Sequence, residues 1–398
     1  MTTVEYRSSA SPVANMLRWV GAIGITAIAV MRCFIVFAPQ LVFDTDPVAD
    51  PDPLAGLAMA GSLWLDVMLL LAAALGLLGE TLAKRGLDWR LMLLALIPVP
   101  ILFWHGSRDI AHLWRGSTWA GAMIAGVTLM HLARDHTIRI VVASLLLGTV
   151  AALLVRGIAQ LSFEHSDMIR TFEQNKDKFL ADRGWAPDSA AARIFERRLR
   201  QPQPTGWFPS TNIYGSLAAF GLISWTGLAI LAARARMQSG WWGAMALLAT
   251  ACAVMLWFTG SKGAIAIALV GLFAALAPMV SVRLRAMLER WGGAVCVGLV
   301  ILTLIAIALR GVALPESFAG DKSLLFRWHY LIASARMFAA NVLVGVGGDG
   351  FQDAYTVFRV PRNPEEVQSA HSLFADWLCT FGIAGATWVV LTLIMVWR

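Results

Sequence analysis

The chain has 398 residues, of which 58% are hydrophobic and only 14% are charged, and its mean hydropathy is +0.67. Soluble domains have about a quarter of their residues charged, so this composition excludes a soluble globular protein and indicates a membrane protein. The net charge of +7 does not indicate nucleic-acid binding, because most of this charge lies in short segments between apolar runs. Four scattered cysteines fit neither a disulfide framework nor a metal site (Cys33, Cys252, Cys296 and Cys379).

Apolar runs of helix length recur along the whole chain, and they are continuous rather than alternating. Continuous runs exclude a transmembrane β-barrel and favour helices, which satisfy their own backbone hydrogen bonds in lipid. The sequence therefore predicts an all-α polytopic membrane protein, with about ten transmembrane helices in a single membrane domain over residues 1–398. Pro98 and Pro100 interrupt the third span, so we expect it to be kinked or incomplete. The predicted spans are Arg18–Ala38, Leu54–Gly79, Leu91–Trp104, Ser117–Ala133, Ile140–Gln160, Trp207–Ala233, Trp241–Phe258, Ala264–Val282, Gly293–Leu309 and Leu373–Val396.

Basic residues gather at alternate ends of these spans. The short loops on one side carry only Arg108, Arg115 and Lys262, whereas most other basic residues of the short segments lie on the opposite side. Because short cytoplasmic loops are enriched in lysine and arginine, this bias predicts a cytoplasmic N-terminus.

Two long loops, residues 161–205 and 311–372, then lie on the outer side. The first carries basic and acidic residues in similar numbers, and long loops follow the charge rule only weakly. Large apolar residues among charges favour interfacial helices in both loops, at Asp167–Asp182, Ser189–Arg200 and Ser323–Ala340. For the first loop, a solvated connector with some helix is an equal alternative.

Two residues of the second long loop, His371 and Arg327, could take part in catalysis. His371 precedes the last span, where the positive end of a helix dipole favours the neutral imidazole that a general base needs. Arg327 begins a polar helix, and its guanidinium presents a fixed fork of donors that matches phosphate oxygens. On position alone, a surface histidine and an interfacial arginine beside lipid headgroups are the simpler interpretations.

A glycine-rich segment, Val344–Phe351, lies between these two residues and includes Gly347 and Gly350. A dinucleotide-binding loop needs a strand before it and a helix after it, and the sequence predicts neither. We interpret the segment as a tight turn that lets the backbone approach a ligand or the membrane closely.

Two polar segments border other spans on the predicted outer side. Ser261 and Lys262 form a short turn, whose lysine can pair with an anionic headgroup or a donor pyrophosphate, or can act only as a topology signal. Asn212 lies in the entry to the sixth span, as a buried polar group that we expect to face the interior of the bundle.

Three ionisable residues lie inside the predicted spans: Arg32, Asp66 and Arg156. Unpaired charges are costly there and usually line a pathway. A non-enzymatic carrier for lipid-linked sugars is therefore an alternative, although carriers place their binding residues near the bilayer midplane rather than in an outer loop.

Taken in chain order, these motifs resemble those of the O-antigen ligase and O-antigen polymerase superfamily of membrane glycosyltransferases. The resemblance covers about residues 205–385. The matching residues are Gly206–Asn212, Ser261–Gly263, Arg327 with Trp328, Gly345–Phe351, Ala370 with His371, and Gly382.

The chain departs from the family pattern at several of these motifs. Lys262 stands where arginine is usual, which keeps the charge but loses the bidentate fork. The last span is followed only by Arg398, whereas family members often continue, so we expect a short or truncated member. The other departures are Ser372 in place of asparagine, Thr380 in place of glutamate, and Ser210 and Thr211 in place of Asn-Pro.

The resemblance implies transfer of a glycan from undecaprenyl diphosphate to a hydroxyl acceptor, on the periplasmic face of the bacterial inner membrane, without a metal or another cofactor. It implies that His371 activates the acceptor, while Arg327 and Lys262 bind the diphosphate. Further substrate-binding residues would be Ser261, Asn212, Gly347 and Gly350. We expect a ligase, whose acceptor is lipid A-core or a protein. The alternative is a polymerase, whose acceptor is a second lipid-linked unit, and the residues alone do not separate the two.

Overall fold

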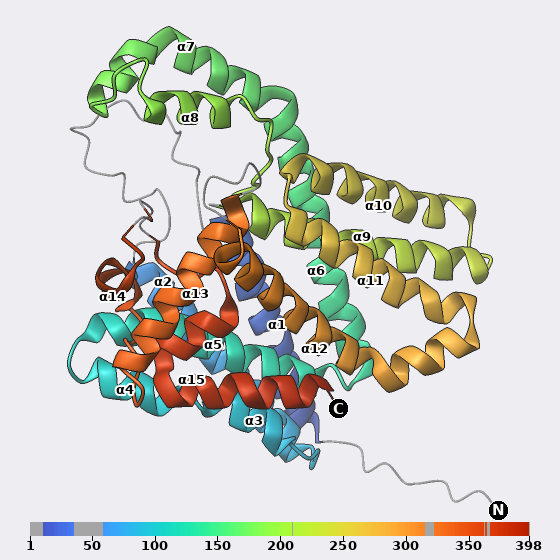
Figure 1. Ribbon diagram of the computed structural model, residues 1–398. Helices are drawn as coiled ribbons and strands as arrows, with labels where there is room; N and C mark the ends of the chain where they lie inside the picture. The colour runs from blue at the N-terminus through green and yellow to red at the C-terminus, as the bar shows by residue number, and fades with distance from the viewer. Residues whose placement is uncertain are drawn as a thin grey trace, which may run out of the picture. The chain divides into compact units, whose positions relative to one another are not determined.

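The computed structural model describes residues 11–35, 59–208, 210–314, 322–361, 363 and 367–397, and every regular element in them is a helix (Figure 1). The prediction of an all-α polytopic fold is confirmed. Within the described residues, nine helices are long and apolar enough to cross a membrane. Contacts divide the chain into two compact units: unit 1 is Met1–Ile25, Ser62–Asp135 and Met287–Arg398, and unit 2 is Thr26–Gly61 and His136–Ala286.

Most helices of unit 1 correspond to predicted spans. The predicted span Ser117–Ala133 corresponds to the C-terminal part of α5 and its C-cap, Ala133; this 23-residue helix is not among the nine apolar candidates. Residues 36–38 and 54–58 of the first two predicted spans lie outside the described residues. The helices are α1 (Pro12–Ile35), α2 (Met59–Leu82), α3 (Trp89–Leu96), α4 (Val99–Gly106), α5 (Ile110–Leu132), α12 (Val282–Val312), α13 (Lys322–Ala340), α14 (Phe351–Phe358) and α15 (Leu373–Trp397). Helices α1, α2 and α12 extend into unit 2.

The prolines of the third predicted span divide it, as expected. Helix α3 ends at Leu96 and α4 begins at Val99, with Pro98 as its N-cap and Pro100 in its first turn. Proline lacks an N–H to donate and its ring clashes with the preceding turn, so a continuous helix would be strained here. The span Trp89–Gly106 therefore consists of two short helices.

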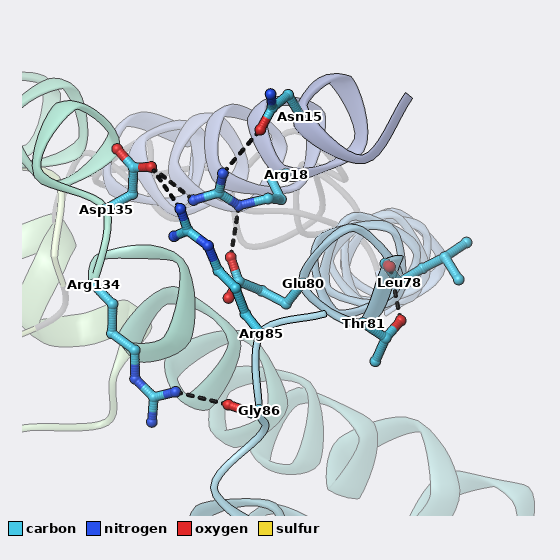
Figure 2. A network of polar contacts seen from close by, with 9 residues as sticks. All are labelled: Asn15, Arg18, Leu78, Glu80, Thr81, Arg85, Gly86, Arg134 and Asp135. Atoms are coloured by element: carbon cyan, nitrogen blue, oxygen red, sulfur yellow. Dashed lines mark hydrogen bonds and ion pairs between the residues drawn. The ribbon is translucent and has the colours of Figure 1, made fainter. Parts of the chain in front are cut away.

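A buried network of charges joins three segments at one end of unit 1 (Figure 2). Arg18 in α1 contacts Glu80 in α2 at 2.6 Å and Asp135, after α5, at 2.9 Å. Arg85 contacts the same Asp135 oxygen at 3.5 Å. Arg18 and Glu80 are 3% and 0% exposed, so each charge depends on its partner for stabilisation.

Close contact between α1 and α2 is possible because glycines line their crossing. A Cβ atom on Gly21 would lie 2.5 Å from the Cα of Gly76. Small residues of this kind let the backbones of membrane helices approach each other.

Unit 2 contains a cluster of spans and a helical hairpin. Its helices are α6 (His136–Ala159), which continues through a π-helix (Gln160–Glu164) into α7 (His165–Asp182), then α8 (Ala190–Leu199), α9 (Thr211–Arg234), α10 (Ser239–Thr259) and α11 (Lys262–Val280). Helix α9 packs against α10 and α11 (Figure 1).

The ends of α10 carry exposed tryptophans, Trp241 near its beginning and Trp257 near its end. They are separated by about 24 Å at the rise of an α-helix. Tryptophan is enriched at the two membrane interfaces, and this separation suits a bilayer core of about 30 Å.

The helices predicted in the two long loops are present as α7, α8 and α13. In the first loop, Phe172 and Phe179 of α7 pack with Ala192 and Leu199 of α8. The apolar faces of this hairpin therefore cover each other. The Ser189 hydroxyl caps α8 by accepting a hydrogen bond from the Ala192 N–H at 3.2 Å.

Candidate active site

His371 occupies an exposed turn just before α15, as expected, and its backbone is in the left-handed conformation with φ of +53°. Only a few per cent of non-glycine residues have a positive φ, because Cβ approaches the following carbonyl oxygen. Its imidazole lies against Tyr330 of α13, with the ring centroids 5.5 Å apart. This is an accessible side chain on a conformationally constrained backbone, which is typical of functional sites.

The support beneath His371 is a buried aromatic and aliphatic cluster formed by α13, α14 and α15, which lie together in Figure 1. Tyr330 is only 5% exposed and its ring centroid lies 6.1 Å from that of Tyr355. The Tyr355 ring stacks on Phe351 at 6.0 Å, and its hydroxyl accepts a hydrogen bond from the Asn363 amide at 2.7 Å. The surface on which the imidazole rests is thus held by packing on several sides.

Arg327 lies in the second turn of α13, rather than at its first residue as predicted. It stands three residues before Tyr330, and residues at this spacing are neighbours on one helix face. Its side chain is half-buried, and no ion pair joins it to another described residue. The helix therefore brings a guanidinium to the face that carries the aromatic contact of His371.

Asp376, in the first turn of α15, is a member of this site that the sequence did not single out. Its side chain is 8% exposed, and its carboxylate accepts the Ala370 N–H at 2.5 Å and the Ser372 N–H. The carboxylate therefore binds the backbone on both sides of His371. An aspartate at the beginning of an apolar span was the available signal, because such a charge needs a partner close by.

The glycine turn lies against a break in α15. At Gly382 the backbone leaves the helix, with φ of +55° and ψ of −131°. The Val346 and Gly347 N–H groups donate to the carbonyls of Cys379 and Thr380 at 2.9 and 3.0 Å, which the broken helix leaves without their usual partners. On the other side of the break, the Ile383 N–H donates to Val342 at 2.7 Å.

Protein atoms surround the two glycines that were predicted to bind substrate. A Cβ atom on Gly347 would lie 2.6 Å from Nδ1 of His112, and one on Gly350 would overlap the Val346 carbonyl oxygen. The close backbone approach is therefore made to other parts of the protein. A helix, α14, directly follows the turn, whereas the sequence had suggested none; it has only eight residues and no strand precedes it in the described chain.

Two histidines at the connection between α4 and α5 fix this turn from the opposite side. His105 Nε2 donates to the Val344 carbonyl at 2.9 Å, and His112 Nδ1 accepts the Asp349 N–H at 3.1 Å. Arg115 forms an ion pair with Asp349 at 2.6 Å. No local pattern in the sequence points to these histidines, because their partners lie more than two hundred residues away.

In unit 2 the structure brings Ser261 and Asn212 together. The Ser261 hydroxyl donates to the Asn212 side-chain oxygen at 2.7 Å and caps α11 by accepting the Ala264 N–H at 3.3 Å. Asn212 is exposed rather than buried, because it lies in the first turn of α9 instead of deep in the bundle. Lys262, the first residue of α11, is also exposed.

The entry to α9 is held by Gln160 in the π-helix. Its side-chain oxygen accepts the N–H groups of Thr205 and Gly206 at 3.0 and 2.8 Å. π-Helical turns are rare in proteins overall, and those that occur are often found at functional sites. Here the turn orients the segment that leads to Asn212.

Two of the three intramembrane charges have partners within their own units. Asp66 is 1% exposed and accepts a hydrogen bond from the Thr118 hydroxyl at 2.7 Å. Arg156 forms an ion pair with Glu164 and lies over the ring of Trp207. These contacts stabilise the two charged side chains inside the predicted spans, so their presence does not require a transport pathway.

Comparison with known proteins matches residues 245–390 to the family model described as O-antigen ligase. No curated protein and no solved structure matches the chain. The matched segment contains Lys262, Arg327 and His371, whereas Asn212 lies before it. The resemblance inferred from the motifs is therefore confirmed for the part of the chain that carries the exposed histidine.

Proposed function

We propose, with the O-antigen ligase domain at residues 245–390 as the premise, that this protein is a glycosyltransferase that moves a glycan from undecaprenyl diphosphate to a hydroxyl of lipid A-core or a similar acceptor. One observation carries the proposal above all. His371 is exposed on a constrained turn, against the helix face that also carries Arg327. An accessible imidazole beside an arginine suits a reaction that deprotonates a hydroxyl and releases a diphosphate.

The chemical step follows from these two groups. The acceptor oxygen attacks the anomeric carbon of the glycan while the imidazole of His371 takes its proton. The bond from that carbon to the diphosphate oxygen breaks, and undecaprenyl diphosphate leaves with the electron pair. The guanidinium of Arg327 stabilises the charge that develops on the leaving group.

We assign the binding of the donor diphosphate to Lys262 as well, with Ser261 and Asn212 as further substrate-binding residues. Support comes from the exposed position of Lys262 at the beginning of α11 and from the hydrogen bond between Ser261 and Asn212. For Gly347 and Gly350 the assigned role is to shape the site, by allowing the tight turn of the backbone. The mechanism assigns no step to a metal ion, so we expect transfer to persist in a chelator such as EDTA.

The proposed location is the bacterial inner membrane, with the N-terminus in the cytoplasm and the site on the periplasmic face. Supporting this, the α4–α5 connection contacts the glycine turn, whereas the Arg18 network joins the other ends of α2 and α5. Alternate ends of consecutive spans face opposite sides of a membrane, which agrees with the distribution of basic residues.

The test is transfer by the purified protein in nanodiscs that contain an undecaprenyl-diphosphate glycan, with and without lipid A-core. Product that forms only with the core acceptor identifies a ligase. Lengthening of the glycan from donor alone identifies a polymerase of the same superfamily. Absence of product in both, from protein shown to be folded, contradicts the proposal and favours the carrier.

For the variant His371→Ala we expect transfer to fall by about a hundredfold or more, because general-base catalysis contributes factors of this size. Expression and thermal stability should change little, since the side chain is exposed. His136→Ala is a matched control, an exposed histidine at the beginning of α6 in the other unit. Full activity of His371→Ala would remove the mechanism.

A further inference from the structure

Asp376 carries a buried carboxylate that the proposed reaction does not use. No ion pair joins it to any other residue in the described ranges. A buried charge is costly unless it is hydrogen-bonded, so its position requires an explanation. Its side chain accepts hydrogen bonds from the two backbone N–H groups that flank His371.

The conformation of His371 explains how one carboxylate reaches both groups. A left-handed residue turns the N–H groups on its two sides toward a common point, and such concavities bind anions. Ala370 and Ser372 supply the two groups here. The anion in the concavity is the carboxylate of Asp376, four residues into the helix that follows.

The hydrogen bonds to Asp376 also offset the energetic cost of the left-handed backbone conformation of His371. A side chain in the left-handed region needs surrounding interactions that hold it there. Hydrogen bonds to an ionised acceptor are stronger than those between neutral groups. Without the carboxylate, the two N–H groups would lose their acceptor and the turn would lose the interaction that favours it.

We propose that Asp376 is a positioning residue, which holds the Ala370–Ser372 backbone so that the imidazole of His371 rests on Tyr330 and faces the acceptor. It acts on the reaction only through the backbone. The inference rests on the proposed function, because it assigns Asp376 a role in the reaction that His371 carries out. A contact that serves only to begin α15 is the competing explanation.

Two substitutions separate these explanations. Asp376→Asn keeps an acceptor oxygen in the same place and removes the charge, whereas Asp376→Ala removes the acceptor. Thr392→Val is the control, because it removes a hydroxyl from the second half of α15, beyond the break at Gly382. Each protein is compared with the wild type in nanodiscs by hydrogen exchange of the peptide that contains residues 367–374, and by transfer kinetics.

For Asp376→Ala we expect faster exchange in this peptide and a kcat reduced by about ten- to a hundredfold, the loss expected when a catalytic group is misplaced by about 1 Å. The donor KM should not change, since Asp376 does not touch the diphosphate. Asp376→Asn should lie between wild type and Asp376→Ala in both measurements. Thr392→Val should match the wild type.

Three outcomes contradict the inference, and each has a different meaning. Faster exchange with unchanged kcat in Asp376→Ala shows a contact that only stabilises the helix, while the proposed function stands. Unchanged exchange shows that the carboxylate does not hold the turn. No transfer by the wild type overturns the proposed function itself.

If Asp376→Ala does not fold, Asp376→Asn decides alone. Unchanged hydrogen exchange together with an unchanged kcat in Asp376→Asn then overturns the inference.

Discussion

Individual residues in this protein are held by a small number of strong polar contacts. Arg18 is the clearest case, because a buried guanidinium binds two carboxylates from different segments (Figure 2). Removal of one partner from a buried ion pair leaves an uncompensated charge in a medium that solvates it poorly. At an exposed position water replaces the lost partner, and the loss is small.

Substitution of Glu80 by alanine should therefore lower the free energy of unfolding by about 3–5 kcal/mol. Arg85→Ala is the matched control from the same network, and because this arginine is 40% exposed it should cost about 1 kcal/mol or less. Thermal unfolding in detergent measures both variants. Equal losses for the two substitutions would show that the network is not dominated by its buried pair.

At the scale of elements, the broken helix α15 organises the proposed site. Its first half begins just after His371, and its last carbonyls accept hydrogen bonds from the glycine turn. The glycine turn is also bound by His112 in the first turn of α5. Irregular backbone is tolerated among membrane helices where protein surrounds it, and these hydrogen bonds meet that condition.

A methyl group at the break should disturb the whole arrangement. In Gly382→Ala the new Cβ would lie 2.6 Å from both the Gly345 nitrogen and the Val342 oxygen, at a positive φ. We expect the free energy of unfolding to fall by about 1–3 kcal/mol from the backbone strain alone, and glycan transfer to be reduced.

Gly298→Ala in α12 provides the control for this substitution. A Cβ there meets no atom within 4 Å, and alanine favours a helix over glycine by about 1 kcal/mol. The control should therefore be neutral or slightly stabilising in the same thermal unfolding measurement. Equal stability of the two variants would contradict the steric argument.

At the scale of the whole molecule, the arrangement of loops relative to the membrane decides which substrates reach the site. The span Trp89–Gly106 connects two exposed positions, Gly86 before it and Ser107 after it. The Arg134 side chain donates to the Gly86 carbonyl near the Arg18 network, whereas the connection that contains Ser107 leads to His112 at the glycine turn. These positions should face opposite sides of the bilayer.

Single cysteines in a cysteine-free background test this orientation. Ser107→Cys should react with a membrane-impermeant maleimide when only the periplasmic face is accessible. Gly86→Cys should react only after the inner membrane is permeabilised; its Cβ has open space, so the substitution itself is mild. The reverse labelling would place the proposed site in the cytoplasm and exclude periplasmic transfer.

Several features could be predicted from residue types and their order alone: the class of the protein, most of its spans, the break at Pro98 and the helices in both long loops. Apolar length, proline chemistry and the order of motifs are local properties, and they also indicated the similarity to O-antigen ligases that residues 245–390 show. The exposed turn of His371 before the last span was predictable for the same reason. The role of each site residue stays a prediction.

Only the tertiary structure revealed how these residues are held. His112 and Asp349 are 237 residues apart, and Arg18 and Asp135 are 117 apart, so no local pattern relates them. The carboxylate of Asp376 is close in sequence to His371, yet its function depends on a left-handed backbone conformation that the residue types do not specify. Spacing and hydropathy follow from the chain alone, whereas hydrogen-bond partners and backbone strain depend on what folding brings into contact.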